Sequence, residues 1–100
     1  MKTTIDQLED RTVVTLEGDF DTAASVEVEK TLRPLIEDGS GHVVIECEKL
    51  TYIASSGLRI LLSLLKSSKA GGGTLLLRNV NENVMKVFIL TGFVNIFKFE

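Results

Sequence analysis

Two adjacent hydroxyl side chains, Ser55 and Ser56, are the residues of this sequence best placed to do chemistry. They follow an apolar, strand-like run and directly precede Gly57 and a leucine-rich run with helical spacing. This pattern predicts that both serines lie at a helix N-terminus, where unpaired backbone N–H groups and the helix dipole favour negative charge. Either serine could cap the helix, and an exposed hydroxyl there could also accept a phosphoryl group.

A pair of carboxylates, Asp19 and Asp21, flanks Phe20 after the second strand-like run. Paired carboxylates can perform acid–base catalysis or hold a metal ion, but no local histidine or further acidic cluster accompanies this pair. Helix capping and turn formation are the simpler interpretation, and contact with a partner is the next. His42 is interpreted as a surface residue at a strand start and Cys47 as a small buried hydrophobe.

The run after the serines carries apolar residues on more than one side of the expected helix. The stripe expected to face the core consists of Leu58, Leu61, Leu62 and Leu65. Ile60 and Leu64 fall near the opposite side at 3.6 residues per turn. Either they form an exposed contact surface beside the serines, or a neighbouring element covers them.

Length and composition indicate one ordinary globular domain over residues 1–100. The chain has 44% hydrophobic residues and a net charge of −3 without a Lys/Arg cluster, which argues against nucleic-acid binding. One cysteine and one histidine exclude an intrachain disulfide and a multi-ligand Cys/His metal site. No signal peptide or membrane-spanning run is recognised, so we expect a cytoplasmic protein without membrane insertion.

Alternating strand and helix patterns predict an α/β fold in the order β-β-α-β-α-β-α-β. The expected architecture is a mixed, mostly parallel sheet with an N-terminal β-hairpin and helices packed against it. Expected strands cover 3–8, 11–17, 43–47, 74–77 and 94–99, and expected helices cover 22–37, 55–69 and a segment from Asn81 or Asn83 to Gly92. The strand at 43–47 is expected to be central and covered on both faces.

Local signals refine the helix ends. Asp21 or Thr22 is expected to cap the first helix, because a side-chain oxygen there reaches the first free N–H groups. Pro34 removes one backbone hydrogen bond, which predicts a kink or an early end of that helix.

Several segments together resemble the STAS domain, in particular the small stand-alone bacterial anti-sigma factor antagonists. The resemblance covers almost the whole chain. The segments that carry it are Gly18-Asp19-Phe20-Asp21, Val43-Val44-Ile45, Ser55-Ser56-Gly57-Leu58, the glycines before Thr74-Leu75-Leu76-Leu77, and Leu90-Thr91-Gly92-Phe93.

The resemblance implies a protein–protein interaction module of a partner-switching pathway rather than an enzyme, with no cofactor. Such proteins regulate transcription through signal transduction: they bind an anti-sigma factor that is also a serine kinase, which frees a sigma factor. The kinase phosphorylates the first serine of an Asp-Ser-Ser/Thr-Gly signature, and a serine phosphatase reverses this. The matching phosphoacceptor is Ser55, with Ser56 as the alternative; Ala54 stands where the aspartate is often found. Asp19 and Asp21 match a loop near the kinase's nucleotide site.

The resemblance also implies a partner-binding surface around the serines. We expect it to comprise Asp19, Asp21, Ala54, Ser56, Gly57, Arg59, Ile60, Ser63 and Leu64. The alternative function is a non-phosphorylated STAS scaffold subunit of a lipid-transport or signalling assembly, docked permanently through the Ile60/Leu64 face. The sequence does not predict the oligomeric state.

Overall fold

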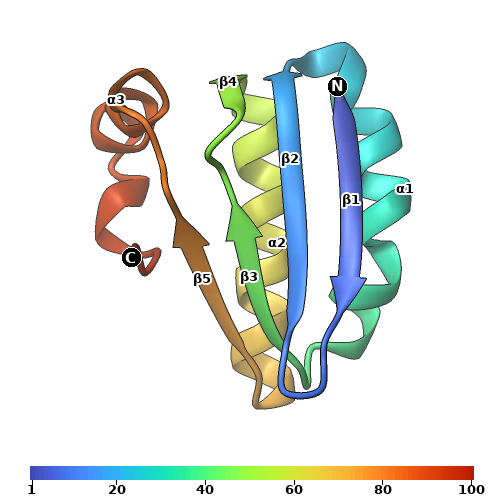
Figure 1. Cartoon of the computed structure of the whole chain (residues 1–100). Coiled ribbons are helices and arrows are strands. Elements are labelled where there is room, and N and C mark those ends of the chain that lie inside the picture. The colour runs from blue at the N-terminus through green and yellow to red at the C-terminus, as the bar shows by residue number, and fades with distance from the viewer.

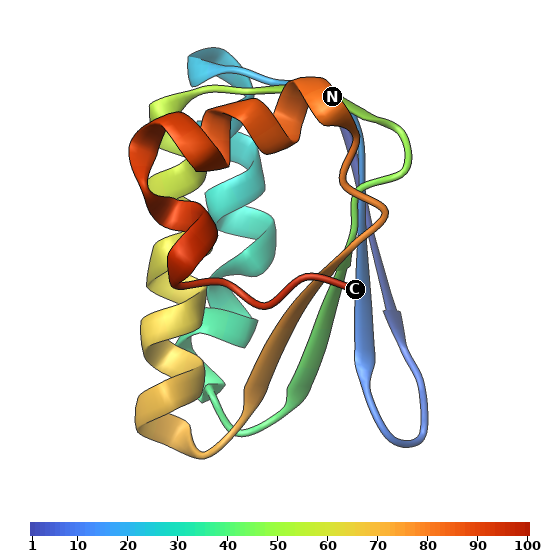
Figure 2. The same ribbon diagram turned by 90° about the vertical axis from the view of Figure 1, so that its left-hand side faces the viewer.

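A five-stranded mixed sheet with its helices packed on one face forms the fold (Figures 1 and 2). The structure is a computed structural model and describes residues 1–100. The elements in chain order are β1 (Lys2–Gln7), β2 (Thr12–Phe20), α1 (Thr22–Asp38), β3 (His42–Glu46), β4 (Leu50–Ile53), α2 (Ser55–Gly71), β5 (Thr74–Arg78), α3 (Glu82–Thr91) and a 3-10 turn, η1 (Phe93–Asn95). None of the helices is long and apolar enough to cross a membrane.

The sheet is mostly parallel, as expected from the alternation of strands and helices. β1 pairs antiparallel with β2, which confirms the opening hairpin, and β2, β3 and β5 then follow as parallel neighbours. β4 pairs in parallel with the end of β2, beyond an irregularity between Gly18 and Asp19. In Figure 1, β4 continues the line of β3 after a short break, so β2 is long enough to pair with both strands.

One face of the sheet carries the core. Val14, Ile45 and Leu77 share a row across β2, β3 and β5, and all three are fully buried. α1 and α2 lie against this face, whereas no helix crosses the opposite face (Figures 1 and 2). The prediction that both faces of β3 are covered is therefore wrong. Val44 on the open face is nevertheless buried, between side chains on the adjacent strands.

The element order differs from the expected one at two places. β4 is an additional strand of four residues, separated from β3 by Cys47–Lys49. The expected strand at 94–99 does not form, except for one bridge between Phe99 and Leu77. Instead the chain turns through η1, because the Phe97 ring packs edge-on against Phe88 at a centroid distance of 5.5 Å.

The helix ends follow the predicted capping residues at most positions. The Asp21 side chain caps α1 by accepting from the N–H of Ala24, and Asn81 caps α3 in the same way. Left-handed glycines follow α1, α2 and α3, as expected at helix C-termini. Of the two effects predicted for Pro34, the early end of α1 is wrong, because the helix continues to Asp38 with the exposed Pro34 inside it; the kink stays a prediction.

Candidate partner-binding site

Ser55 is the first residue of α2, and its side chain is exposed. The N-cap position belongs to Ala54, which has extended backbone angles and no capping side chain. The prediction that a serine caps this helix is therefore wrong, because the helix begins one residue too early for Ser55 to occupy the cap. The first intrahelical bond runs from the N–H of Leu58 to the carbonyl of Ala54. The three preceding N–H groups have no intrahelical acceptor, so the surface at Ser55 favours negative charge.

Ser56 has a different environment from its neighbour. It is half-buried, and its Oγ lies 2.8 Å from the Oγ of Ser25 on α1. Ser25 donates its own hydroxyl proton to the carbonyl of Asp21 at 2.8 Å, and a carbonyl can only accept. Ser56 must therefore be the donor to Ser25. The chain of bonds Ser56–Ser25–Asp21 ties the start of α2 to the start of α1.

The acidic segment lies beside the serines and is held in place by hydrogen bonds. The Oδ1 of Asp19 accepts from the Thr51 hydroxyl at 2.6 Å, and both Asp19 and Asp21 are exposed. The N–H of Ala54 donates to the carbonyl of Phe20 at 2.8 Å, and the Phe20 ring is fully buried. This backbone bond brings the chain on either side of it together: Asp19 and Asp21 flank Phe20, and Ser55 directly follows Ala54.

Gly57 explains why the serine pair is followed by a glycine. A Cβ atom at this position would lie 3.0 Å from the Ile53 side chain and 3.1 Å from the Phe20 ring. The missing side chain lets α2 begin directly above these core residues. Gly57 is buried, so the structure places it beneath the surface on which we expected it.

Ile60 and Leu64 are also buried, with exposed fractions of 5% and 0%. Of the two alternatives for this side of the helix, covering by a neighbouring element is confirmed and the exposed contact surface is wrong, so neither residue belongs to the expected partner-binding surface. α1 and α2 pack together, and Ile60 lies beside α1 residues. Arg59 and Ser63, each directly before one of these buried residues, are exposed and border the groove between the two helices.

Of the residues expected in the site, hydrogen bonds link Ser56 through Ser25 to the Asp21 carbonyl and link Ala54 to Phe20, between Asp19 and Asp21. Ser56, Arg59, Ile60 and Ser63 line one groove. Two residues that support them were not foreseen. Thr51 lies in the unpredicted strand β4 and gave no local signal. Ser25 could have been found, because it precedes the buried Val28 and Leu32 at helical spacing and so places a polar group on an apolar stripe.

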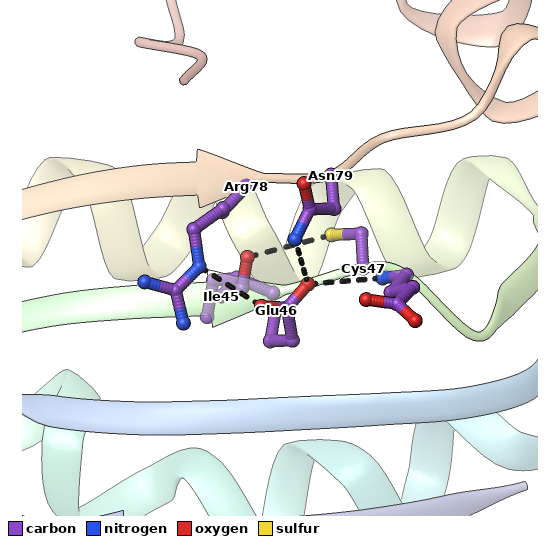
Figure 3. A network of polar contacts seen from close by, with 6 residues as sticks. Ile45, Glu46, Cys47, Arg78 and Asn79 are labelled. Carbon is purple, nitrogen blue, oxygen red and sulfur yellow. Dashed lines mark hydrogen bonds and ion pairs between the residues drawn. The ribbon is translucent and has the colours of Figure 1, made fainter.

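A second polar cluster joins the ends of β3 and β5 (Figure 3). Glu46 accepts from Arg78 Nε at 2.9 Å, from Asn79 Nδ2 at 3.0 Å and from the N–H of Glu48 at 3.2 Å. Burial raises the pKa of Glu46, but these hydrogen bonds outweigh burial and lower its pKa overall. Burial likewise raises the pKa of Cys47 to about 12, so this thiol is unreactive. The cluster stabilises the fold and offers no free catalytic group.

No group of three or more His, Cys, Asp or Glu side chains is arranged to hold a metal ion. The exposed chemistry of the candidate site is therefore one hydroxyl at a helix N-terminus and two neighbouring carboxylates.

Comparison with known proteins identifies the family. The sequence profile of the STAS domain matches residues 2–100. BtrV of Bordetella bronchiseptica, provisionally named an anti-sigma factor antagonist, is 32% identical over 97% of this chain and 84% of its own. A Thermotoga maritima structure with the same provisional name has a TM-score of 0.86 at 20% identity, over 97% of this chain and 84% of that one. The phosphorylated form of SpoIIAA from Bacillus has a TM-score of 0.75 at 21% identity, over 99% and 91% of the two chains. The resemblance seen in the sequence is confirmed, and the chain belongs to the STAS domain family.

Proposed function

We propose that this protein is an anti-sigma factor antagonist whose binding is switched off by phosphorylation of Ser55. Its partner would be an anti-sigma factor that is also a serine kinase, and a serine phosphatase would restore binding. The observation that carries the proposal is the exposed Ser55 at the first position of α2, directly after the Ala54 N–H that bonds to Phe20 between the exposed Asp19 and Asp21. The family membership supports it, because relatives are named anti-sigma factor antagonists and SpoIIAA is described in both unphosphorylated and phosphorylated forms.

The structure favours Ser55 over Ser56 as the phosphoacceptor. The Ser55 side chain is exposed, so a kinase reaches it without moving a helix. The Ser56 hydroxyl donates to Ser25 between α1 and α2, and a phosphate there would have to break this bond and separate the helices. The position of residue 54 is held by its main chain, because the N–H of Ala54 donates to the carbonyl of Phe20 at 2.8 Å, so this anchor does not require an aspartate side chain.

A phosphate on Ser55 would act on the surface rather than on the fold. It adds about −1.5 to −2 charges at neutral pH, and the helix N-terminus favours such a charge by about 0.3–1 kcal/mol. A hundredfold loss of affinity requires only about 2.7 kcal/mol. Burying that charge in an interface, or placing it against partner carboxylates, costs at least this much.

The alternative of a permanently docked, non-phosphorylated scaffold loses its structural support. It depended on an exposed Ile60/Leu64 face, and both side chains are buried.

The test uses purified anti-sigma factors of the source genome, each incubated with this protein and ATP and followed by intact-mass measurement. The matched variants are Ser55→Ala and Ser40→Ala, which removes another exposed serine outside the expected partner-binding surface and the α1–α2 groove. We expect one phosphoryl group on the wild type and on Ser40→Ala, none on Ser55→Ala, and at least about a hundredfold weaker binding of the phosphorylated protein. Phosphorylation that persists in Ser55→Ala, or equal binding of both forms, would contradict the proposal.

A further inference from the structure

A groove of about 430 Å³ runs between α1 and α2 and opens beside the serines. Its charged side chains are Lys30 and Arg33 from α1, Arg59 from α2, and a single carboxylate, Glu29. The groove is therefore positively charged on a protein whose net charge is −3. Val26, with 59% of its surface exposed, adds an apolar contact at the rim.

Arg59 is the free cation of this groove. Arg33 pairs with Glu29 at 2.8 Å and Lys30 approaches Glu27 at 3.8 Å. Arg59 is exposed and takes part in none of the ion pairs of the chain. The Arg59 guanidinium has no carboxylate partner within its own chain. Such a group is well suited to bind a carboxylate of another protein through two parallel hydrogen bonds.

We propose that the α1–α2 groove binds an acidic segment of the partner protein, with Arg59 as its main anchor. This inference rests on the proposed function and deepens it by stating which chemistry the partner presents. Charge complementarity carries it: three cations line the groove, two of them are paired with Glu27 and Glu29, and the third, Arg59, is unpaired.

The position of the groove links this contact to the switch. Ser55 and Arg59 are four residues apart on α2, so their side chains are neighbours on the helix surface. A phosphate on Ser55 competes with the partner's carboxylates for Arg59 and also repels them. One modification thereby removes the anchor and adds a repulsive charge at the mouth of the same groove.

The experiment measures the affinity of the purified anti-sigma factor for Arg59→Glu and for a matched control, Lys66→Glu, at low and at high salt. Lys66 is an exposed cation of the same helix that does not border the groove, so both variants change the net charge equally. We expect Arg59→Glu to bind at least tenfold more weakly and to show a smaller salt dependence, while Lys66→Glu stays within about twofold of the wild type. Arg59→Gln serves as a second variant, with thermal unfolding as the check on folding.

The outcomes separate this inference from the function on which it rests. If the wild type binds no anti-sigma factor, the proposed function fails. If the wild type binds and Arg59→Glu and Arg59→Gln bind equally well, only the groove proposal is overturned. Equal weakening by Lys66→Glu overturns it too, because net charge alone would then account for the loss. A further arm measures binding to phosphatidylglycerol vesicles. If Arg59→Glu abolishes vesicle binding but leaves the affinity for the anti-sigma factor unchanged, the groove binds lipid and the proposal is overturned.

Discussion

Replacing the two serines singly by alanine should have unequal effects on stability. The Ser55 side chain is exposed and caps nothing, so Ser55→Ala should change the free energy of unfolding by less than about 0.5 kcal/mol. Ser56 donates a part-buried hydrogen bond of 2.8 Å to Ser25 across the helix interface. Its loss in Ser56→Ala should cost about 0.5–1.5 kcal/mol, the net contribution of a neutral hydrogen bond.

The contact itself can be isolated with a double-mutant cycle. Ser25→Ala also removes the bond to the Asp21 carbonyl, but that carbonyl keeps the N–H of Ser25 as a donor at 3.0 Å. The sum of the losses in Ser25→Ala and Ser56→Ala should therefore exceed the loss in the double variant. The difference is the coupling energy, which we expect to be about 0.5–1 kcal/mol. A matched cycle between Ser25 and Ser55 should give no coupling.

Urea unfolding followed by circular dichroism is the assay. With a slope of about 1–3 kcal/mol per molar urea, a loss of about 1 kcal/mol moves the midpoint by roughly 0.3–1 M, which is readily resolved. Equal losses in Ser55→Ala and Ser56→Ala, or zero coupling between Ser25 and Ser56, would refute the described interface. The structural reason to prefer Ser55 as the phosphoacceptor would then disappear.

Three further predictions concern the rest of the fold. Glu46→Gln should lower the free energy of unfolding at neutral pH by about 1–2 kcal/mol. Because hydrogen bonds hold the folded-state pKa of Glu46 below its unfolded value, this stabilisation is present above the unfolded pKa of about 4.3 and is lost as the pH falls through the folded pKa. Urea unfolding at successively lower pH should therefore show the difference between variant and wild type shrinking below about pH 4. Gly73→Ala should lower the free energy of unfolding by at least about 2 kcal/mol, because the added Cβ would overlap the Gly41 carbonyl oxygen. The control Gly41→Ala adds a Cβ that meets no atom within 4 Å, so its free energy of unfolding should stay within about 0.5 kcal/mol of the wild type in the same assay. Leu64→Ala should cost about 2–5 kcal/mol in thermal unfolding; a neutral result combined with lost partner binding would restore Leu64 as an exposed contact.

Features set by neighbouring residues could be predicted from the sequence. The hairpin, the three helices and the caps at Asp21 and Asn81 depend on side-chain alternation, helical spacing and oxygens that reach an N–H three residues away. The glycines after the helices belong to the same class. Ser55 and Asp21 were therefore placed correctly near two helix starts, although the cap of α2 was assigned one residue too late.

Features set by distant partners could not be predicted in this way. β4 has four residues and forms because the end of β2, more than thirty positions earlier, offers it a pairing edge. The helical period places Ile60 and Leu64 on a second side of α2, but only the packing of α1 decides whether that side is covered. The bond between Ser25 and Ser56 depends on the same packing, which is why its role was missed.

The rigidity of the site determines what kind of switch it can support. The start of α2 is held by the bond from Ala54 to Phe20, by the close packing of Gly57 on the Phe20 ring, and by the bond between Ser56 and Ser25. A phosphate on Ser55 gains at most about 1 kcal/mol from the helix dipole, whereas separating the two helices would break buried packing worth several kilocalories per large side chain. The proposed phosphorylation would therefore leave the backbone in place and change only the charge that a partner meets. Its effect on binding would come from the local potential around Arg59, Asp19 and Asp21, so raised salt should weaken the difference in partner affinity between the modified and unmodified proteins.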